Sequence, residues 1–279
     1  MYSFSLLSGI SFDTISDDIR LILDKRPPVA ESLPALNQVF SFMDFTSLEG
    51  SDTHEKIKAL CEKAISFGEK GLPCPAAVCI YPPFISTAKS VLKGTPIRVA
   101  TTAAAFPNGQ MPLSVKLAEI RYAVNEGADE IDVVISRGTF LEKEYNQIYR
   151  EIDAMRDVTK HNLLKVILET GELVTPENIA RASEIAIEAG ADFIKTSTGK
   201  ITPAATEEAV FVMLKVIGEY YRKTGKKIGI KPAGGISDPE KALGYHCLVK
   251  ELLGNDWLTP ELFRIGASRL ADRIADIIL

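Results

Sequence analysis

The chain has 279 residues, of which 46% are hydrophobic and 25% are charged, the balance of a globular protein with a full core. Its net charge of −5 and pI of about 5.4 argue against nucleic acid or an anionic membrane as a partner, because no basic patch would attract them. No apolar stretch approaches the roughly 20 residues that span a bilayer, and the first residues lack the basic region of a signal peptide. We therefore expect a soluble, cytoplasmic protein.

The cysteines and histidines give no sign of a disulfide framework or a metal site. The four cysteines form no CxxC pair, and a chain of this length does not need disulfides to fold, so reduced thiols are expected. The three histidines are scattered without the spacing of zinc ligands. The sequence therefore predicts no zinc site.

After a leader of about 36 residues, strand-like and helix-like segments alternate at the spacing of βα units. Several helical patterns end at a glycine, which most easily takes the left-handed conformation beyond a helix C-terminus. Eight strands, each followed by a helix, is the count of a TIM (β/α)8 barrel, an α/β fold. We expect an N-terminal extension, at least partly helical, over residues 1–36 and one catalytic barrel domain over residues 37–279. The expected strands are Phe40–Phe45, Ala76–Tyr81, Arg98–Thr102, Glu130–Ile135, Leu164–Glu169, Phe193–Thr196, Lys227–Pro232 and Phe263–Gly266.

Ionisable residues alternate with apolar residues along these strands. In EIDVVI, Ile131 and Val133 share one face and leave Asp132 on the other, because successive side chains of a strand point to opposite faces. If the apolar faces meet the outer helices, the ionisable groups point into the barrel, whose lumen is normally filled by branched aliphatic side chains. Burying an unpaired ion costs several kcal/mol of folding free energy. A function therefore explains this set of charges better than packing does. The alternative is that the charges pair with one another and only fill the lumen. The inward-facing set is Asp44, Asp132, Lys165, Glu169, Lys195, Lys231 and Arg264.

Two of these residues, Lys195 in ADFIKTSTGK and Lys231 in KIGIKPAGG, stand where a strand runs out into its loop. A lysine amine attacks carbonyls only when it is neutral, and both burial and a neighbouring cation lower its pKa. We interpret Lys195 as the nucleophile and Lys231 as the cation that depresses its pKa. Asp132 would move protons. Together these residues predict Schiff-base chemistry on a carbon–carbon bond.

Small-residue loops at the same rim indicate a phosphate site. In TIM barrels phosphate often binds between the loops after strands seven and eight, near a helix N-terminus. Gly234 and Gly235 in PAGGIS allow close backbone approach, and Ser268 in GASR opens the last helix with a hydroxyl and free amides. The TSTGK segment adds Gly199 and Lys200. Three such loops on one rim favour an anionic ligand.

These motifs resemble a known family. FIKTSTGK, GIKPAGGIS, ADEIDVVIS, LLKVILETGEL, CIYPPFI, FMDFTSL and FRIGAS together resemble 2-deoxyribose-5-phosphate aldolase, a class I aldolase family, over residues 38–270. The resemblance implies reversible cleavage of 2-deoxy-D-ribose 5-phosphate to D-glyceraldehyde 3-phosphate and acetaldehyde without a metal or organic cofactor, and its partners would be these small molecules. It assigns Lys195 as the Schiff-base lysine, Lys231 as its helper and Asp132 as the proton shuttle. It further implies ion-pair or positioning roles for Asp44 and Lys165, a pocket-lining place for Cys79, and phosphate contacts for Gly199, Lys200, Gly234, Gly235, Gly266 and Ser268.

The chain departs from the family pattern at three places. Arg269 stands where many members have a second serine after Ser268, and it would either strengthen phosphate binding or face solvent. Ser237 replaces the basic residue that some members carry after the glycine pair. The chain ends in IADIIL without the tyrosine-ended tail of some relatives. Proton transfer would then rest on Asp132, Lys231 and water.

Other interpretations stay open at this point. The same barrel suits a sugar-phosphate isomerase or epimerase that works without a covalent adduct, or a sensor that binds without turnover. Independently of the function, single residues have alternative interpretations: Lys231 as a structural partner of Asp132, Lys200 as a solvated loop lysine and Cys79 as a small buried hydrophobe. The sequence does not fix the number of subunits, and a homo-oligomer is one option.

Overall fold

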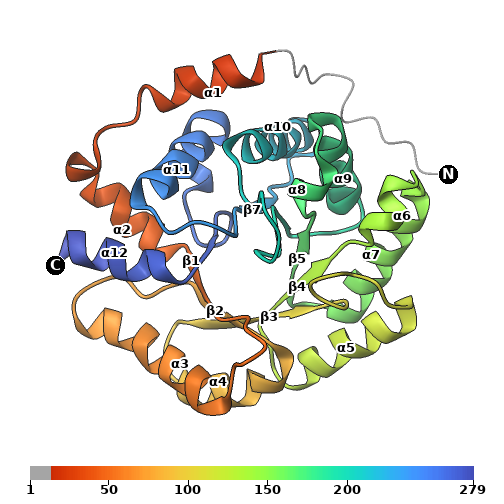
Figure 1. Cartoon of the computed structure of the whole chain (residues 1–279), viewed down its shortest axis with the longest axis horizontal. Coiled ribbons are helices and arrows are strands. Elements are labelled where there is room, and N and C mark those ends of the chain that lie inside the picture. The colour runs from red at the N-terminus through yellow and green to blue at the C-terminus, as the bar shows by residue number, and fades with distance from the viewer. Residues whose placement is uncertain (1–13) are drawn as a thin grey trace.

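In the computed structural model, which describes residues 14–279, eight parallel strands form a ring at the centre of the molecule and helices surround it (Figure 1). Each strand pairs with the next from β1 to β7, and β8 pairs with β1. Two single bridges, Ile230 to Phe263 and Ala233 to Gly266, join β7 to β8 and close the ring. The predicted TIM barrel is confirmed. Its strands are β1 (Met43–Thr46), β2 (Ala77–Ile80), β3 (Arg98–Ala103), β4 (Glu130–Val134), β5 (Leu163–Ile167), β6 (Phe193–Lys195), β7 (Gly229–Lys231) and β8 (Ile265–Ala267).

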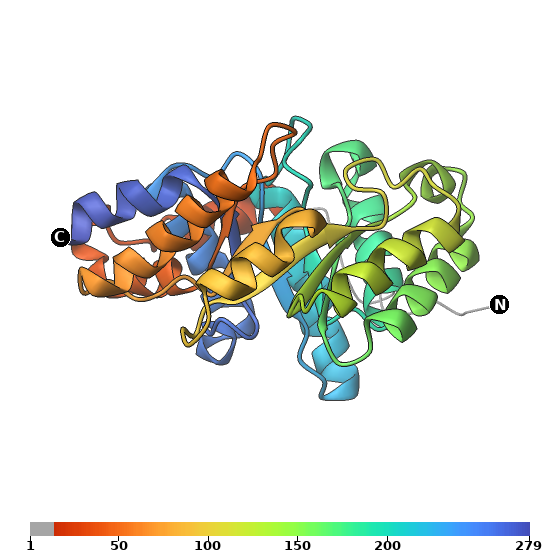
Figure 2. The ribbon, with the colours of Figure 1, turned by 90° about the horizontal axis from the view of Figure 1, so that it is seen from below.

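The helices lie outside the strands and return the chain to the start of the next strand (Figure 2). Thr206 illustrates a helix start, because its side chain accepts a hydrogen bond from the backbone N–H of Ala209, and Gly225 in the left-handed conformation ends the same helix. The α-helices are α1 (Ile15–Leu23), α2 (Leu33–Ser41), α3 (His54–Glu69), α4 (Ile85–Val91), α5 (Leu113–Asn125), α6 (Arg137–Leu141), α7 (Tyr145–Thr159), α8 (Thr170–Leu173), α9 (Pro176–Glu188), α10 (Glu207–Thr224), α11 (Pro239–Leu253) and α12 (Arg269–Ile278). Short 3-10 turns are η2 (Val29–Glu31), η3 (Pro82–Phe84) and η4 (Asn255–Trp257).

The beginning of the first strand was placed too early. Phe40 belongs to α2, and β1 begins only at Met43. Leu36, Val39 and Phe40 are all buried at the three- and four-residue spacing of a helix face. A short apolar run such as QVFSFMDF does not by itself distinguish a helix from a strand, and the barrel's packing decides the boundary.

Two helices precede the barrel within the described residues. α1 packs on the outside of α10 and α11, and α2 packs against α11 and α12 (Figure 1). The helical extension expected from the sequence is therefore present from residue 15, while residues 1–13 of that extension lie outside the described part. Residue 37, the expected start of the barrel domain, falls inside α2. None of the helices between residues 14 and 279 is long and apolar enough to cross a membrane.

The two faces of the strands separate apolar from ionisable residues, as the alternation predicted. Ile131 and Val133 of β4 belong to the large apolar core formed with the outer helices. Asp132 and Glu130, on the other face, are fully buried and contact charged residues of other strands. The helices therefore supply the hydrophobic stabilisation, while the lumen holds polar groups that need partners.

Gly229 is required by a close contact inside the barrel. A Cβ atom at this position would lie 2.4–2.5 Å from three ring atoms of Phe193, its neighbour on β6. We expect Gly229→Ala to lower the free energy of unfolding by about 1–3 kcal/mol, because the ring has to move in a packed interior. Gly138→Ala in α6, where a Cβ meets nothing within 4 Å, is the matched control and should not destabilise. Urea denaturation of both variants measures this, and equal midpoints would contradict the packing argument.

Candidate active site

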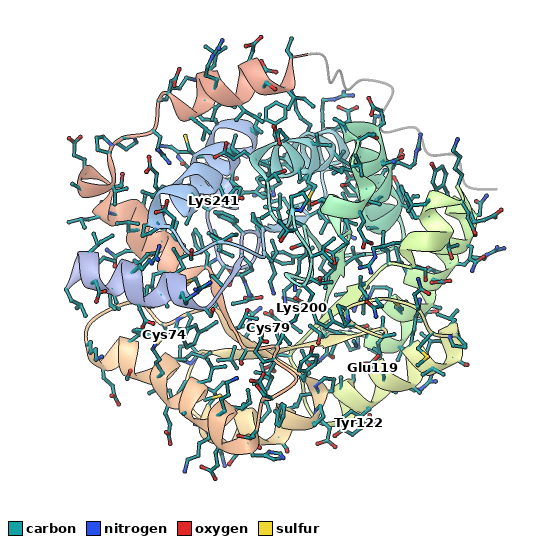
Figure 3. All side chains as sticks on the ribbon, viewed as in Figure 1. Cys74, Cys79, Glu119, Tyr122, Lys200 and Lys241 are labelled. Atoms are coloured by element: carbon teal, nitrogen blue, oxygen red, sulfur yellow. The ribbon has the colours of Figure 1, made fainter. Side chains whose placement is uncertain are left out.

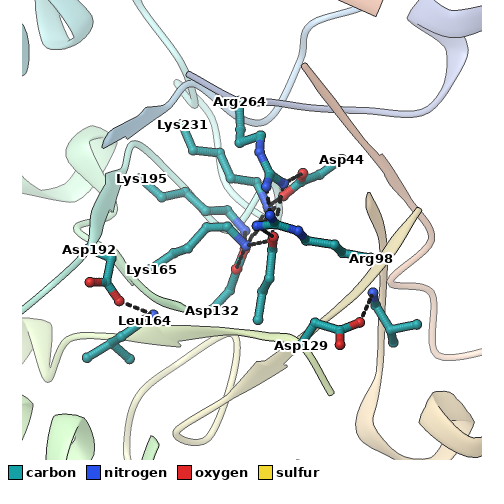
Figure 4. Close-up of polar contacts among 12 residues, drawn as sticks. Asp44, Arg98, Asp129, Asp132, Leu164, Lys165, Asp192, Lys195, Lys231 and Arg264 are labelled. Atoms are coloured by element: carbon teal, nitrogen blue, oxygen red, sulfur yellow. Dashed lines mark hydrogen bonds and ion pairs between the residues drawn. The ribbon is translucent and has the colours of Figure 1, made fainter. Parts of the chain in front are cut away.

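A cluster of seven charged side chains fills the lumen of the barrel (Figure 4). Each strand that contributes to it alternates inward and outward side chains, so residues of different strands reach the same central space. We call this group the lumen cluster. It consists of Asp44 from β1, Glu130 and Asp132 from β4, Lys165 from β5, Lys195 from β6, Lys231 from β7, and Arg264 immediately before β8, all buried.

Asp132 is the centre of this cluster. Its Oδ2 accepts hydrogen bonds from the Nζ of Lys195 at 2.8 Å and of Lys231 at 2.7 Å. Its Oδ1 accepts one from the Nζ of Lys165 at 2.8 Å. Burial alone would raise the pKa of Asp132, but the three lysines outweigh it and hold its pKa well below the ordinary value. The group is therefore a carboxylate that bridges three amines.

The other two carboxylates fix the remaining cations. Asp44 accepts from Lys231 and, at 2.6 Å, from Arg264 Nη1. Glu130 accepts from Arg264 Nη2 at 2.7 Å and contacts Lys165 Nζ at 2.6 Å. Charge-assisted hydrogen bonds of this length are the strongest class of protein hydrogen bond. They hold Lys165 and Lys231 in defined positions around Asp132.

The charges of the lumen cluster do not balance when every lysine is protonated. Within the described part of the chain, the cluster holds four cations and three carboxylates. Lys165 and Lys231 each contact at least two carboxylates, whereas Lys195 contacts only Asp132, which it shares. Arg98, which is partly exposed, also reaches Glu130 at 3.3 Å. Because an uncompensated buried charge is costly, Lys195 is the amine that most readily gives up its proton.

The pKa shifts agree with this account. Burial lowers the pKa of the Lys195 amine, Asp132 opposes the shift, and the Lys231 cation adds to it. Burial would also lower the pKa of Lys231, but Asp132 and Asp44 outweigh it and raise that pKa above the ordinary value. The predicted depression of Lys195 by Lys231 thus has the right direction, although burial contributes more.

A cavity of about 170 Å³ opens at the C-terminal edge of the strands, and Lys195 is the member of the lumen cluster that lines it. We call it the rim cavity. A larger hollow of about 630 Å³ lies between α1, α9 and α10, but it touches no residue of the lumen cluster and offers no reactive amine. All the residues predicted to contact phosphate line the rim cavity, together with Ser237 and Arg269: Gly199, Lys200, Gly234, Gly235, Gly266 and Ser268.

Glu169 tethers the loop after β6 and was placed in the lumen by the sequence pattern. It lies beyond the end of β5 in a left-handed conformation with φ 57°. Its carboxylate accepts hydrogen bonds from the backbone N–H of Thr198 at 3.1 Å and from the Thr198 hydroxyl at 2.5 Å, and it pairs with Arg137 at 3.1 Å. Glu169 therefore positions Thr198 and its neighbours at the rim cavity instead of joining the lumen cluster.

Cys79 lies in the lumen but does not line the rim cavity (Figure 3). It packs with Leu48, Ala77 and Ala100 in a small apolar cluster, and burial raises the pKa of its thiol. This environment favours the interpretation of Cys79 as a small buried hydrophobe. The four cysteines are free.

Two residues of the cluster were not given a role from the sequence. Glu130 shares the inward face with Asp132 two residues later, which is the signal that identifies it, and Arg264 was placed inward without a function.

No group of three metal-binding side chains occurs among residues 14–279. His54 contacts Thr87, and His246 contacts Gln38.

The comparisons with known proteins agree on one family. Residues 38–244 match the model of the DeoC/LacD family aldolase. The chain belongs to this family. Deoxyribose-phosphate aldolase of Homo sapiens is 47% identical over 252 residues, covering 86% of this chain and 79% of the human protein. The enzyme of the same name from Bos taurus is 44% identical over 270 residues, covering 91% and 84%.

One solved structure supports the same assignment, and a second shows the same fold. A protein described as QR15, an aldolase, superposes with a TM-score of 0.69 at 29% identity, covering 85% of this chain and 96% of that one. Tetrameric deoxyribose phosphate aldolase from Aeropyrum pernix has a TM-score of 0.69 at 24% identity, covering 96% and 98%, and shows the shared fold. The chain is thus an aldolase built on a TIM barrel.

Proposed function

We propose that this aldolase cleaves 2-deoxy-D-ribose 5-phosphate reversibly to D-glyceraldehyde 3-phosphate and acetaldehyde through a Schiff base on Lys195. The observation that carries the proposal is the position of Lys195. Its buried amine has one shared carboxylate partner, a lowered pKa and a place in the lining of the rim cavity. The names of the human and bovine relatives support the substrate.

In the proposed reaction, the neutral amine of Lys195 attacks the C1 aldehyde of the open-chain sugar, and loss of water gives a protonated Schiff base. A base removes the proton of the C3 hydroxyl. The C2–C3 bond then breaks, releasing glyceraldehyde 3-phosphate and leaving an enamine on Lys195. Protonation at C2 and addition of water release acetaldehyde and restore the amine.

Asp132 is the proposed proton carrier, with Lys231 as its partner. While three ammonium groups surround Asp132, its pKa is too low for it to accept a proton readily. As the C2–C3 bond breaks, the Schiff-base nitrogen loses its positive charge, and the pKa of Asp132 rises toward the range of a useful base while it receives the proton of the C3 hydroxyl. Lys231, hydrogen-bonded to the same oxygen, would pass the proton on through water.

The proposed phosphate site is the part of the rim cavity around Gly199, Gly234, Gly235 and Ser268. A Cβ atom added at Gly234 would lie 2.6 Å from Ser197 Oγ and 3.0 Å from the Cα of Gly199. A side chain at residue 234 would therefore fill the space between the two loops. Ser268 precedes α12, whose first amides are free to meet an anion.

Trapping the adduct tests the proposal. Acetaldehyde with sodium borohydride should leave a reduced, stable N-ethyl group, and peptide mass spectrometry should find it on Lys195. Labelling on surface lysines such as Lys70 alone, or full activity of the reduced protein, would contradict the Schiff base. An isomerase or epimerase working without a covalent adduct would give no trapped product and no release of acetaldehyde.

We also infer a cytoplasmic location, supported by four free cysteines in a chain that does not depend on disulfides. Fractionation with a compartment marker tests it. We also propose a homo-oligomer, because the Aeropyrum pernix relative is described as a tetramer. Light scattering of the purified protein measures the oligomeric state directly.

A further inference from the structure

An ion pair joins two loops across the mouth of the rim cavity. The loop between β1 and α3 and the loop between β6 and α10 project side by side from the C-terminal edge of the barrel (Figure 2). Lys200 Nζ on the second loop lies 3.2 Å from Glu49 Oε1 on the first. Both residues line the rim cavity. The cation predicted to meet phosphate therefore already has a partner in the free protein.

Hydrogen bonds hold the backbones of Glu49 and Lys200 in place, so the contact forms between two ordered loops. The backbone N–H of Glu49 donates to Asp52 Oδ2 at 3.0 Å, and Asp52 also accepts from the Ser47 hydroxyl at 2.9 Å. On the other side, the backbone N–H of Lys200 donates to the Thr198 hydroxyl at 3.1 Å, and Thr198 is bound to Glu169. The two loops, each fixed by its own hydrogen bonds, thus bring the opposite charges of Glu49 and Lys200 together at the rim cavity.

Glu49 is the one carboxylate among the residues that line the rim cavity, whose basic side chains are Lys195, Lys200 and Arg269. Building on the proposed function, we propose that Glu49 sets the affinity of this site for phosphate-bearing ligands. Its carboxylate occupies Lys200 in the free enzyme, and the ligand's phosphate displaces it. Glu49 is therefore an internal competitor that weakens the binding of every anion at this cavity.

The exposure of the pair fits an exchange of partners. The side chains of Lys200 and Glu49 are 30% and 63% exposed, so water replaces the contact at little cost when Lys200 turns to another anion. Exposed ion pairs of this type change an equilibrium constant by less than about fivefold. Removing the charge of Glu49 should therefore tighten phosphate binding by about two- to fivefold.

Calorimetric titration of inorganic phosphate into the full-length protein tests the exchange. Glu49→Gln should bind phosphate about two- to fivefold more tightly than the wild type. In a Lys200→Ala background the same substitution should give little gain, because the two residues act as one pair. No gain from Glu49→Gln, or an equal gain in both backgrounds, would overturn the proposal.

Glu69→Gln is the matched control. Glu69 is exposed at the end of α3, which runs away from the rim, and the variant removes one negative charge without touching the cavity. Its phosphate affinity should equal that of the wild type. A gain as large as that of Glu49→Gln would show that the change in net charge alone causes the effect, and it would overturn the proposal. The titration needs no turnover, so a failure of the proposed aldol reaction would show in the trapping experiment and not here.

Discussion

Replacing Lys195 by leucine is expected to abolish aldol cleavage while leaving the barrel folded. The substitution removes the one amine of the lumen cluster that lines the rim cavity, so turnover should fall by at least about 10⁴-fold. Stability should be retained, because the lumen cluster then holds three cations and three carboxylates, and Asp132 keeps Lys165 and Lys231. Cleavage is measured by coupled release of glyceraldehyde 3-phosphate, and the fold by thermal unfolding.

Lys195→Arg separates the loss of the amine from the loss of the charge. The guanidinium remains charged at all relevant pH values and does not form a Schiff base. This variant should be as inactive as Lys195→Leu, but it should also unfold at a lower temperature, because it fixes the fourth cation in the cluster. Cleavage by either variant within about tenfold of the wild-type rate would remove Lys195 from the proposed role.

Replacing Lys231 by leucine is expected to move the pH–rate profile to higher pH. The Lys231 cation lowers the pKa of Lys195, so its removal raises that pKa. The charge count has the same effect, because Lys195 then becomes the third cation needed to balance three carboxylates. At a given pH a smaller fraction of Lys195 is neutral, and the acidic limb of kcat/KM should shift upward by about one unit or more, a loss of about tenfold at neutral pH.

Lys231→Arg is the control for charge, since it retains a cation beside Asp132 and Asp44. Its pH profile should stay closer to the wild type than that of Lys231→Leu, even if the larger side chain lowers the rate. An unchanged acidic limb in Lys231→Leu would show that Lys231 has a structural role only. Near-ultraviolet circular dichroism of both variants checks that the lumen is still packed.

Much of the fold and of the lumen was predictable because both depend on local periodicity. The alternation of Ile131, Asp132 and Val133 determines which side chain faces inward whatever the final strand pairing is. Glycine after a helical pattern likewise marks a chain reversal, as at Gly225. The comparisons then agreed with the family suggested by the motifs.

The features that escaped prediction depend on contacts between distant segments. Glu130 begins its strand, and its importance arises from Lys165 and Arg264, which other parts of the ring bring to it. Phe40 lies in α2 because this helix packs its apolar face against the barrel, and a short apolar run does not specify such packing. The Lys200–Glu49 contact joins loops 151 positions apart, and no sequence spacing specifies such a pair.

The balance of charge in the lumen has a consequence for the direction of electron flow in the proposed reaction. A protonated Schiff base on Lys195 restores a fourth positive charge among three carboxylates, in a space shielded from water. Breaking the C2–C3 bond sends an electron pair toward that nitrogen and discharges it. In the proposed reaction the surplus cation would thus serve as an electron sink, and the unequal number of buried cations and carboxylates would favour cleavage once the proton of the C3 hydroxyl has left the cluster.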